Sequence, residues 1–224
     1  MYRKYIKRGL DFTVALIALI LLFFPLLLLT GLTAYKMKGN PFFVQPRPGY
    51  KEKIFWLIKF RSMQNTRDAD GNLLPDDLRL TSYGRFLRST SLDELPELIN
   101  VLKGDMSFIG PRPQLVRDMV FMTEEQRRRH SVRPGLSGLA QVSGRNAILW
   151  ENKLALDLQY LSEISFTTDC RLCFETAKLM LFGPETEEEV EITSDFGDYL
   201  LEKGEVDEAT YHRLQEEAKE LLGV

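Results

Sequence analysis

The chain has 224 residues, of which 44% are hydrophobic and 27% charged, with two cysteines and a formal net charge of −3. These values are typical of a folded domain with a hydrophobic core, and they exclude a disordered, collagen-like or disulfide-framework protein. The charge is unevenly distributed, because residues 1–40 carry +5, residues 41–183 carry +3 and residues 184–224 carry −11. We therefore expect three parts with these boundaries.

The first part has the composition of a membrane segment. No charged residue occurs over the 24 positions from Phe12 to Tyr35, a length that crosses the hydrocarbon core of a bilayer. Pro25 lies in the middle of this run and breaks a helix, because it has no backbone N–H to donate. Basic residues flank the run on both sides, and basic flanks favour the cytoplasmic face. The pattern predicts a re-entrant helix-break-helix hairpin, and a kinked helix that crosses the bilayer is the alternative.

The second part begins with signals for a short strand and a helix. Residues 53–61 are aromatic and β-branched and predict a strand that carries Lys59. Apolar residues recur at helical spacing over residues 95–102. Pro96 is compatible only with the first turn of that helix, so we expect its N-cap near Asp93.

The adjacent carboxylates Asp93 and Glu94 have two interpretations. Aspartate is a favoured N-cap and Ser91 with Glu94 matches a capping box, which would make the pair structural. The other interpretation is a site, because arginines chelate phosphate oxygens in a bidentate manner and Mg²⁺ prefers one or two carboxylates together with substrate phosphates. The arginines within sixty residues of the pair include Arg85, Arg88, Arg112, Arg133 and Arg145. The set predicts a magnesium–diphosphate site.

The second part also contains a basic run that we do not expect to belong to that site. The run Arg127–His130 is expected to be a solvated or membrane-facing helix surface. Nucleic acid is not an expected partner, because this part is only mildly basic and contains no aromatic platform motif.

The third part is acidic and predicts a pair of helices. A run of glutamates follows Pro184, and Asp207 matches the N-cap of a final helix. One face of that helix is apolar and contains Tyr211, Leu214, Ala218, Leu221 and Leu222. We expect a helical hairpin that docks on the body or on a second copy in a homo-oligomer, and catalysis that changes by no more than a few-fold when this hairpin is removed. A mobile solubilising tail is the alternative, since short isolated helices are marginal.

Three sequence motifs carry a family resemblance over residues 1–183. They are Lys59-Phe60-Arg61-Ser62-Met63, the segment from Thr90 to Pro113 with Asp93-Glu94-Leu95-Pro96 in it, and the segment from Arg133 to Asn146. In these motifs the chain resembles the bacterial sugar transferase family, the monotopic phosphoglycosyl transferases, and its length resembles the small members. The resemblance implies transfer of a sugar 1-phosphate from a UDP-sugar to a polyprenyl phosphate, usually undecaprenyl phosphate. UMP is released, Mg²⁺ is the cofactor, and the intermediate is a phosphosugar bound to an aspartate.

The resemblance also implies roles for individual residues. Asp93 matches the nucleophile and would share Mg²⁺ with the substrate phosphates, and Glu94 matches its partner carboxylate. Arg88, Arg112 and Arg145 match ligands of phosphate or nucleotide. Lys59 matches a lysine that braces the site, and Asp157 matches a downstream acid near it. The chain departs from the small members at the membrane break, where Phe24-Pro25 stands in place of Ser-Pro.

The sequence therefore predicts an α-rich α+β monotopic membrane protein. A re-entrant hairpin over residues 1–40 would precede a compact catalytic domain with short strands over 41–183 and an acidic helical appendage over 184–224. The expected location is the cytoplasmic face of the bacterial inner membrane, with both termini in the cytoplasm. The expected activity initiates glycoconjugate synthesis, and the alternative is a membrane-anchored UDP-sugar-binding or adaptor protein without catalysis.

Overall fold

The computed structural model describes residues 1–68, 70–144, 148–182 and 194–223, and this part of the chain is rich in helix. The longer helices are α1 (Lys7–Leu21), α2 (Phe23–Met37), α9 (Trp150–Glu163), α10 (Phe166–Phe182) and α12 (Glu208–Leu222). The shorter ones are α3 (Asp76–Arg79), α4 (Ser82–Ser89), α5 (Glu97–Lys103), α6 (Val116–Met119), α7 (Glu124–Arg127), α8 (Leu139–Gly144) and α11 (Phe196–Glu202). The strands are β1 (Phe42–Pro48), β2 (Ile54–Phe60), β3 (Ser107–Ile109) and β4 (Gly135–Ser137). A short π-helix is η1 (Tyr2–Ile6), and short 3₁₀ helices are η2 (Tyr50–Glu52), η3 (Leu92–Glu94) and η4 (Arg128–Ser131). The predictions of a helix-rich fold and of short strands are confirmed.

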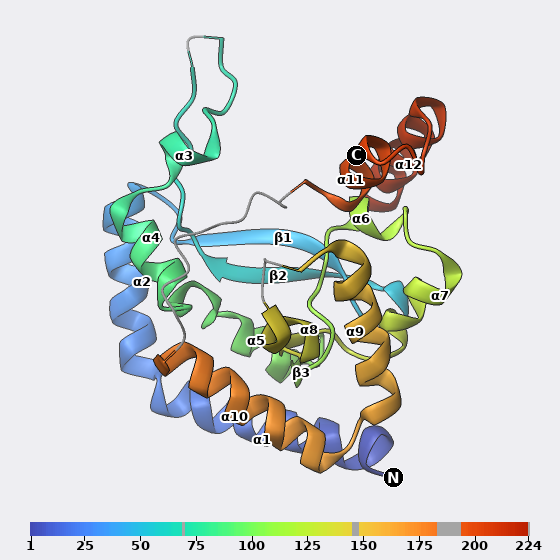
Figure 1. The fold of residues 1–224 in the computed structure, drawn as a ribbon. Coiled ribbons are helices and arrows are strands. Elements are labelled where there is room, and N and C mark those ends of the chain that lie inside the picture. The colour runs from blue at the N-terminus through green and yellow to red at the C-terminus, as the bar shows by residue number, and fades with distance from the viewer. Residues whose placement is uncertain (69, 145–147, 183–193, 224) are drawn as a thin grey trace.

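The apolar N-terminal run folds as two helices, α1 and α2, which meet at Leu22 with a bend of 67° (Figure 1). The helix α1 ends at Leu21, whose carbonyl group is the one that an N–H at position 25 would bond. Pro25 is the third residue of α2, where a missing N–H costs nothing. Within the described residues no single helix has the length and apolarity to cross a membrane, and this bent pair passes only by length and composition.

Both ends of the bent pair are attached to the rest of the protein. At its start, Arg8 donates to the carbonyl oxygens of Val101 and Leu102 at 2.6 and 2.7 Å, where α5 ends. The Phe108 N–H donates to Asp11 at 3.2 Å. Near its end, the hydroxyl groups of Thr33 and Tyr83 are 2.8 Å apart. The start and the end of the pair therefore lie on the same globular body.

The outer surface of the bend is apolar and exposed. Four side chains around Leu22 keep between 66% and 76% of their surface accessible, namely Ile20, Leu21, Phe24 and Leu28. Exposed apolar surface of this extent is typical of a contact with lipid or with another protein.

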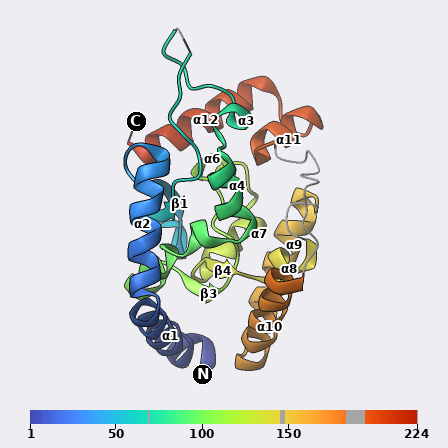
Figure 2. The same ribbon diagram turned by 90° about the vertical axis from the view of Figure 1, so that its left-hand side faces the viewer.

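The strands lie between two groups of helices (Figure 2). The strands β1 and β2 form an antiparallel ribbon in which Phe42 faces Phe60, while β3 and β4 form a short parallel pair. This second pair depends on glycine, because a Cβ at Gly135 would lie 2.1 Å from the backbone nitrogen of Gly110. Figure 2 shows α1 and α2 on one side of the strands and α9 and α10 on the other.

A buried carboxylate joins the N-terminus to the helices on the opposite side. Asp169 at the start of α10 accepts hydrogen bonds from the Tyr2 hydroxyl at 2.6 Å and from the Tyr160 hydroxyl at 2.7 Å. The Lys7 ammonium lies 2.5 Å from the same carboxylate. The basic residues that precede the apolar run are thus used in part to bind the body.

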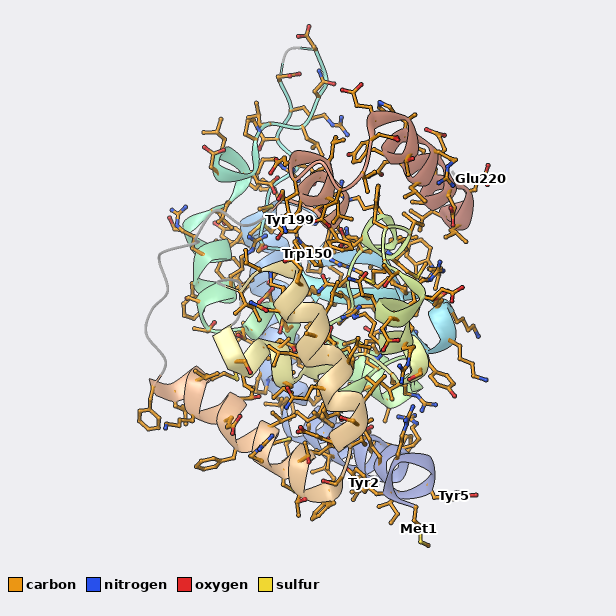
Figure 3. All side chains as sticks on the ribbon, turned by 45° about the vertical axis from the view of Figure 1, so that its right-hand side comes forward. Met1, Tyr2, Tyr5, Trp150, Tyr199 and Glu220 are labelled. Carbon is orange, nitrogen blue, oxygen red and sulfur yellow. The ribbon has the colours of Figure 1, made fainter. Side chains whose placement is uncertain are left out.

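The C-terminal part forms the predicted helical pair and packs on the body. Phe196, Tyr199 and Leu200 of α11 and Ala218 of α12 share a buried apolar cluster with Trp150 and with residues of α6. Trp150 and Tyr199 lie together where α9 meets α11 (Figure 3). The described residues 194–223 form helices packed on the body, in contrast to the alternative of a mobile tail. The predicted apolar face was partly wrong, because Leu221 and Leu222 are exposed.

The first prediction concerns the bend. Replacing Pro25 with alanine supplies a backbone N–H at position 25 that can donate to the Leu21 carbonyl group. We therefore expect α1 and α2 to form one straighter helix. The measurement is pulsed EPR between spin labels placed at positions 10 and 35, in a background with both native cysteines changed to serine. In a straight helix the two Cα atoms would be about 37 Å apart, so the measured distance should lengthen toward that value.

Leu28→Ala in α2 is the matched control and should leave the label distance unchanged, because Leu28 is exposed and no proline is altered. An unchanged distance in Pro25→Ala itself would show that attachment to the body, rather than the proline, sets the bend.

Candidate active site

Lys59 lies near the end of β2, and the buried side chain of Asn100 in α5 holds this strand in place. The Asn100 amide donates to the Trp56 carbonyl oxygen at 2.7 Å and accepts from the Ile58 N–H at 3.1 Å. It therefore pairs with the free edge of β2 as a neighbouring strand would. This contact fixes Lys59 beside the segment that leads into α5.

Asp93 and Glu94 lie in the 3₁₀ turn η3, which precedes α5. Ser91 enters this turn with a φ of +54°, and the turn closes on its own hydrogen bond from the Glu94 N–H to the Ser91 carbonyl oxygen at 3.2 Å. The helix α5 begins only at Glu97, with Pro96 at its N-cap. The prediction of an N-cap near Asp93 is therefore wrong, and neither carboxylate caps α5 with its side chain.

Glu94 is held between two cations. Its Oε1 lies 2.6 Å from the Lys59 ammonium and 3.1 Å from the Arg112 guanidinium. Lys59 also lies 3.2 Å from Glu97, whose side chain is only 4% exposed. Burial opposes the charge on Glu94, but Arg112 and Lys59 outweigh it and hold the pKa of Glu94 below its ordinary value. Burial raises the pKa of Glu97 despite the nearby Lys59.

Asp93 differs from its neighbour because its carboxylate has no hydrogen bond or ion pair among the described residues. The residue is 9% exposed, and burial raises its pKa, while Lys59, Arg88 and Arg112 oppose that rise. A carboxylate that is unpaired and close to three cations has its lone pairs available for a ligand or an electrophile.

Arg112 is positioned by a buried ion pair that connects it to α9. Arg129 donates to the Arg112 carbonyl oxygen at 2.6 Å and to Asp157 at 2.6 and 2.9 Å. Arg129 and Asp157 are each 2% exposed. Asp157 thus acts on the site through Arg129 in this structure, and its predicted contact with substrate stays a prediction.

The expectation of a solvated surface at Arg127–His130 is wrong for two of its members. Arg129 and His130 are buried, and burial lowers the pKa of His130 to about 4, so that it is neutral near pH 7. Arg128 does face solvent, in an ion pair with Glu125 at 2.6 Å. Arg129 lies within the uninterrupted basic run Arg127–His130, and nothing in that run distinguishes it from its neighbours, so the sequence did not reveal its role.

Arg88 extends from α4 toward the same region. Its Nε donates to the Ser62 hydroxyl at 3.0 Å. The close approach of α4 needs a glycine, because a Cβ at Gly84 would lie 1.8 Å from the Ser62 carbonyl oxygen. Arg145, which the sequence also predicted as a phosphate ligand, lies outside the described residues. The structure therefore gathers Lys59, Glu94 and Arg112 in direct contact, with Asp93 and Arg88 beside them.

A cavity of about 690 Å³ borders this cluster, a size typical of sites for small ligands. At one end Glu94 and Arg112 line it, and apolar side chains of α5, β3 and β4 form much of its wall. Ser194 and Asp195, which precede α11, also line it. The acidic part therefore contributes to the wall of this cavity, and the expectation that catalysis changes little without it stays a prediction. Pro25, the third residue of α2, is not among the residues that line this cavity.

The donor set allows one kind of magnesium site. No group of three or more histidine, cysteine or acidic side chains that could hold a metal occurs in the described parts of the chain. Glu94 and Glu97 are engaged by Lys59, which leaves Asp93 as the carboxylate without a partner there. One carboxylate fits Mg²⁺ that takes its other ligands from water and substrate phosphates.

Comparisons with known proteins agree on one family. The family model for bacterial sugar transferases matches residues 2–183. The sugar transferase EpsL of Bacillus subtilis, itself uncharacterised, is 46% identical over 177 residues, which cover 79% of this chain and 88% of EpsL. The UDP-N-acetylgalactosamine-undecaprenyl-phosphate N-acetylgalactosaminephosphotransferase of Aeromonas hydrophila is 39% identical over 191 residues, covering 80% of this chain and 44% of that protein.

The undecaprenyl-phosphate galactose phosphotransferase of Salmonella typhimurium is 33% identical over 195 residues, covering 80% of this chain and 41% of that protein. The chain thus spans less than half the length of these two larger relatives. It belongs to the bacterial sugar transferase family, and the prediction of a phosphoglycosyl transferase is confirmed at that level. The acidic helical pair lies beyond the residues that the family model matches.

The second prediction concerns the buried ion pair. Arg129→Gln leaves Asp157 buried without its cation, and breaking such a pair costs about 3–5 kcal/mol of stability. The neighbouring variant Arg128→Gln breaks an exposed pair instead and should cost less than about 1 kcal/mol. Chemical unfolding of the detergent-solubilised protein measures both losses, and equal losses would contradict an anchoring role for Arg129.

Proposed function

We propose that this bacterial sugar transferase moves a sugar 1-phosphate from a UDP-sugar to undecaprenyl phosphate and releases UMP. The names of two relatives support the acceptor, since both are undecaprenyl-phosphate phosphotransferases. The observation that carries the proposal is the unpaired Asp93 carboxylate, which lies beside the cations that bind Glu94. The reaction would be the first membrane step of glycoconjugate or polysaccharide synthesis.

The reaction proposed for Asp93 has two steps. An Asp93 oxygen attacks the phosphorus that bears the sugar, and the bond from that phosphorus to the UMP oxygen breaks, so that UMP leaves with the electron pair. A phosphate oxygen of undecaprenyl phosphate then attacks the same phosphorus and displaces the aspartate. A carboxylate is a weak nucleophile, and it suffices here because nearby cations neutralise the charge of the diphosphate.

Each of the other polar residues has a place in this scheme. Arg112 and Arg88 bind phosphate oxygens, and Lys59 keeps Glu94 in position beside Asp93. Asp93, with the substrate phosphates, is the residue that would hold Mg²⁺. When bound, Mg²⁺ supplies charge neutralisation at the phosphate oxygens. Arg129 with Asp157 fixes the backbone at Arg112.

We propose further that α1 and α2 form a re-entrant hairpin in the inner membrane. Both ends of the pair are bonded to one body, at Arg8 and Asp11 and again at Thr33. A helix pair that crossed the bilayer would have to separate these attachments. The exposed apolar bend would enter the lipid, and the body with both termini would lie on the cytoplasmic face.

The third prediction tests this topology. Cysteines introduced at positions 3 and 36, with Cys170 and Cys173 changed to serine, should both react with a membrane-impermeant maleimide in inside-out vesicles only. The reason is that both positions belong to the body side of the bend. Labelling of the two positions from opposite sides of the membrane would establish a crossing helix and reject the hairpin.

The fourth prediction tests the nucleophile. Asp93→Asn should abolish UMP release and the protein-bound label obtained from a UDP-sugar with a radioactive β-phosphate, while the thermal unfolding midpoint stays near that of the wild type. The exposed residue Asp77 provides the control, and Asp77→Asn should keep full activity. Activity of Asp93→Asn within about tenfold of wild type, a barrier change of roughly 1.4 kcal/mol, would make the assignment wrong.

A panel of UDP-sugars with undecaprenyl phosphate present tests the activity as a whole. Release of UMP that depends on both substrates supports the proposed function. A UDP-sugar-binding or adaptor protein without catalysis would release none with any member of the panel.

A further inference from the structure

The acidic helical pair approaches the candidate active site at one place, the residues that precede α11. Ser194 and Asp195 line the same cavity as Glu94 and Arg112, although they lie outside the residues that the family model matches. The wall that they form is thus an addition that this chain makes to the matched domain.

The backbone on either side of Asp195 is fixed by hydrogen bonds to the body. On one side, the Trp150 indole N–H donates to the Ser194 carbonyl oxygen at 3.1 Å. On the other, the Phe196 N–H donates to the Asp118 carboxylate at 3.0 Å. Asp118 is 2% exposed and also accepts from the Leu115 N–H, so it connects α11 to the segment that follows Arg112. Asp195 is therefore held in a defined position before any ligand arrives.

Packing under these bonds is close. Trp150 and Phe196 lie with ring centroids 5.1 Å apart. A Cβ at Gly197 would lie 2.5 Å from the Phe121 ring, so α11 sits against the segment that follows α6 more closely than a larger residue allows. At its other side α11 is bonded to α9 through the Tyr199 hydroxyl and Glu151, at 2.7 Å. The helical pair is thus built into the body around the cavity.

One oxygen of the Asp195 carboxylate is available. Oδ2 forms an ion pair with Arg117, whereas Oδ1 has no hydrogen bond among the described residues. The side chain keeps 22% of its surface accessible. Lys153 of α9 lines the same cavity, and its ammonium lies over the Trp150 ring at 5.3 Å from the centroid without an ion pair in the part of the chain described. A free acceptor and a free donor on one wall suit a ligand rich in hydroxyl groups.

We propose that Asp195 is a specificity-determining residue, which accepts a hydrogen bond from a hydroxyl group of the nucleotide-sugar donor. The inference rests on the proposed function. The hydroxyl belongs either to the sugar ring or to the ribose, because both are attached to the diphosphate that Arg112 binds. A fixed charged acceptor discriminates between ligands, since a ligand that lacks the hydroxyl leaves the partly buried carboxylate oxygen without a partner in the occupied site.

The test compares ligands that differ by a single hydroxyl group. One arm measures kcat/KM for pairs of C4-epimeric UDP-sugars, UDP-glucose with UDP-galactose and their N-acetylated counterparts. The other arm measures the binding of UMP and 2′-deoxy-UMP by titration calorimetry. The full chain should discriminate at least about tenfold in one arm. Asp195→Ser, with a shorter side chain, should bring that ratio to within about twofold of unity, and Asp195→Asn, whose amide oxygen still accepts a hydrogen bond but carries no charge, should lower it less.

Glu202→Gln is the matched control, because Glu202 is an exposed acid on the same helix α11 and should leave both ratios unchanged. A merely structural effect of the Asp195 variants would lower kcat/KM or affinity for all ligands by the same factor and leave the ratios as they were. Ratios unchanged in both arms and in both variants overturn the inference, whether or not the rates fall.

The two proposals fail in different ways. A chain that binds UMP and loses discrimination in Asp195→Ser, but releases no UMP from any UDP-sugar, would refute the proposed function and keep the role of Asp195. A chain with full turnover and unaltered ratios would keep the proposed function and refute the role of Asp195. Absence of both turnover and nucleotide binding would refute both.

Discussion

The candidate site depends on Lys59, which pairs with two carboxylates and leaves that of Asp93 without a partner among the described residues. Its ammonium binds Glu94 and Glu97, and Arg112 completes the pairing of Glu94. Two adjacent acids at 93 and 94 would repel each other without this compensation. Because Glu94 is engaged, Asp93 keeps an unpaired carboxylate among cations. The position of Lys59 follows in turn from Asn100, which binds the free edge of β2.

A second buried pair gives the opposite wall its rigidity. Arg129 and Asp157 connect α9 to the backbone at Arg112, and such a pair is costly to break because both charges are removed from water. The acidic helices then join α9 to α6 through Trp150 and Asp118. The cavity is therefore lined by segments that lie far apart in the sequence, and these bonds connect several of them.

The sequence predicted the features that depend on local chemistry. The break beside Pro25, the strand that carries Lys59 and the final helix after Asp207 all follow from the backbone preferences of a few residues, and the structure has them. It did not predict features that depend on long-range pairing. Arg129 looks like its exposed neighbour Arg128 until Asp157, 28 residues away, is placed beside it. The N-cap prediction failed because the 3₁₀ turn at Asp93 satisfies its own backbone.

The fold separates the basic and the acidic parts of the chain in space. The basic N-terminus and the acidic helices lie at opposite ends of the molecule (Figure 1). If the bend of the hairpin enters the membrane, this arrangement keeps the acidic helices away from anionic headgroups, which would repel them. Among the described acids of this part of the chain, Asp195 lines the cavity, while acids such as Glu202 and Glu220 are exposed to solvent. This segment can remain acidic on its outer surface because apolar residues such as Phe196 and Leu200 pack on the body.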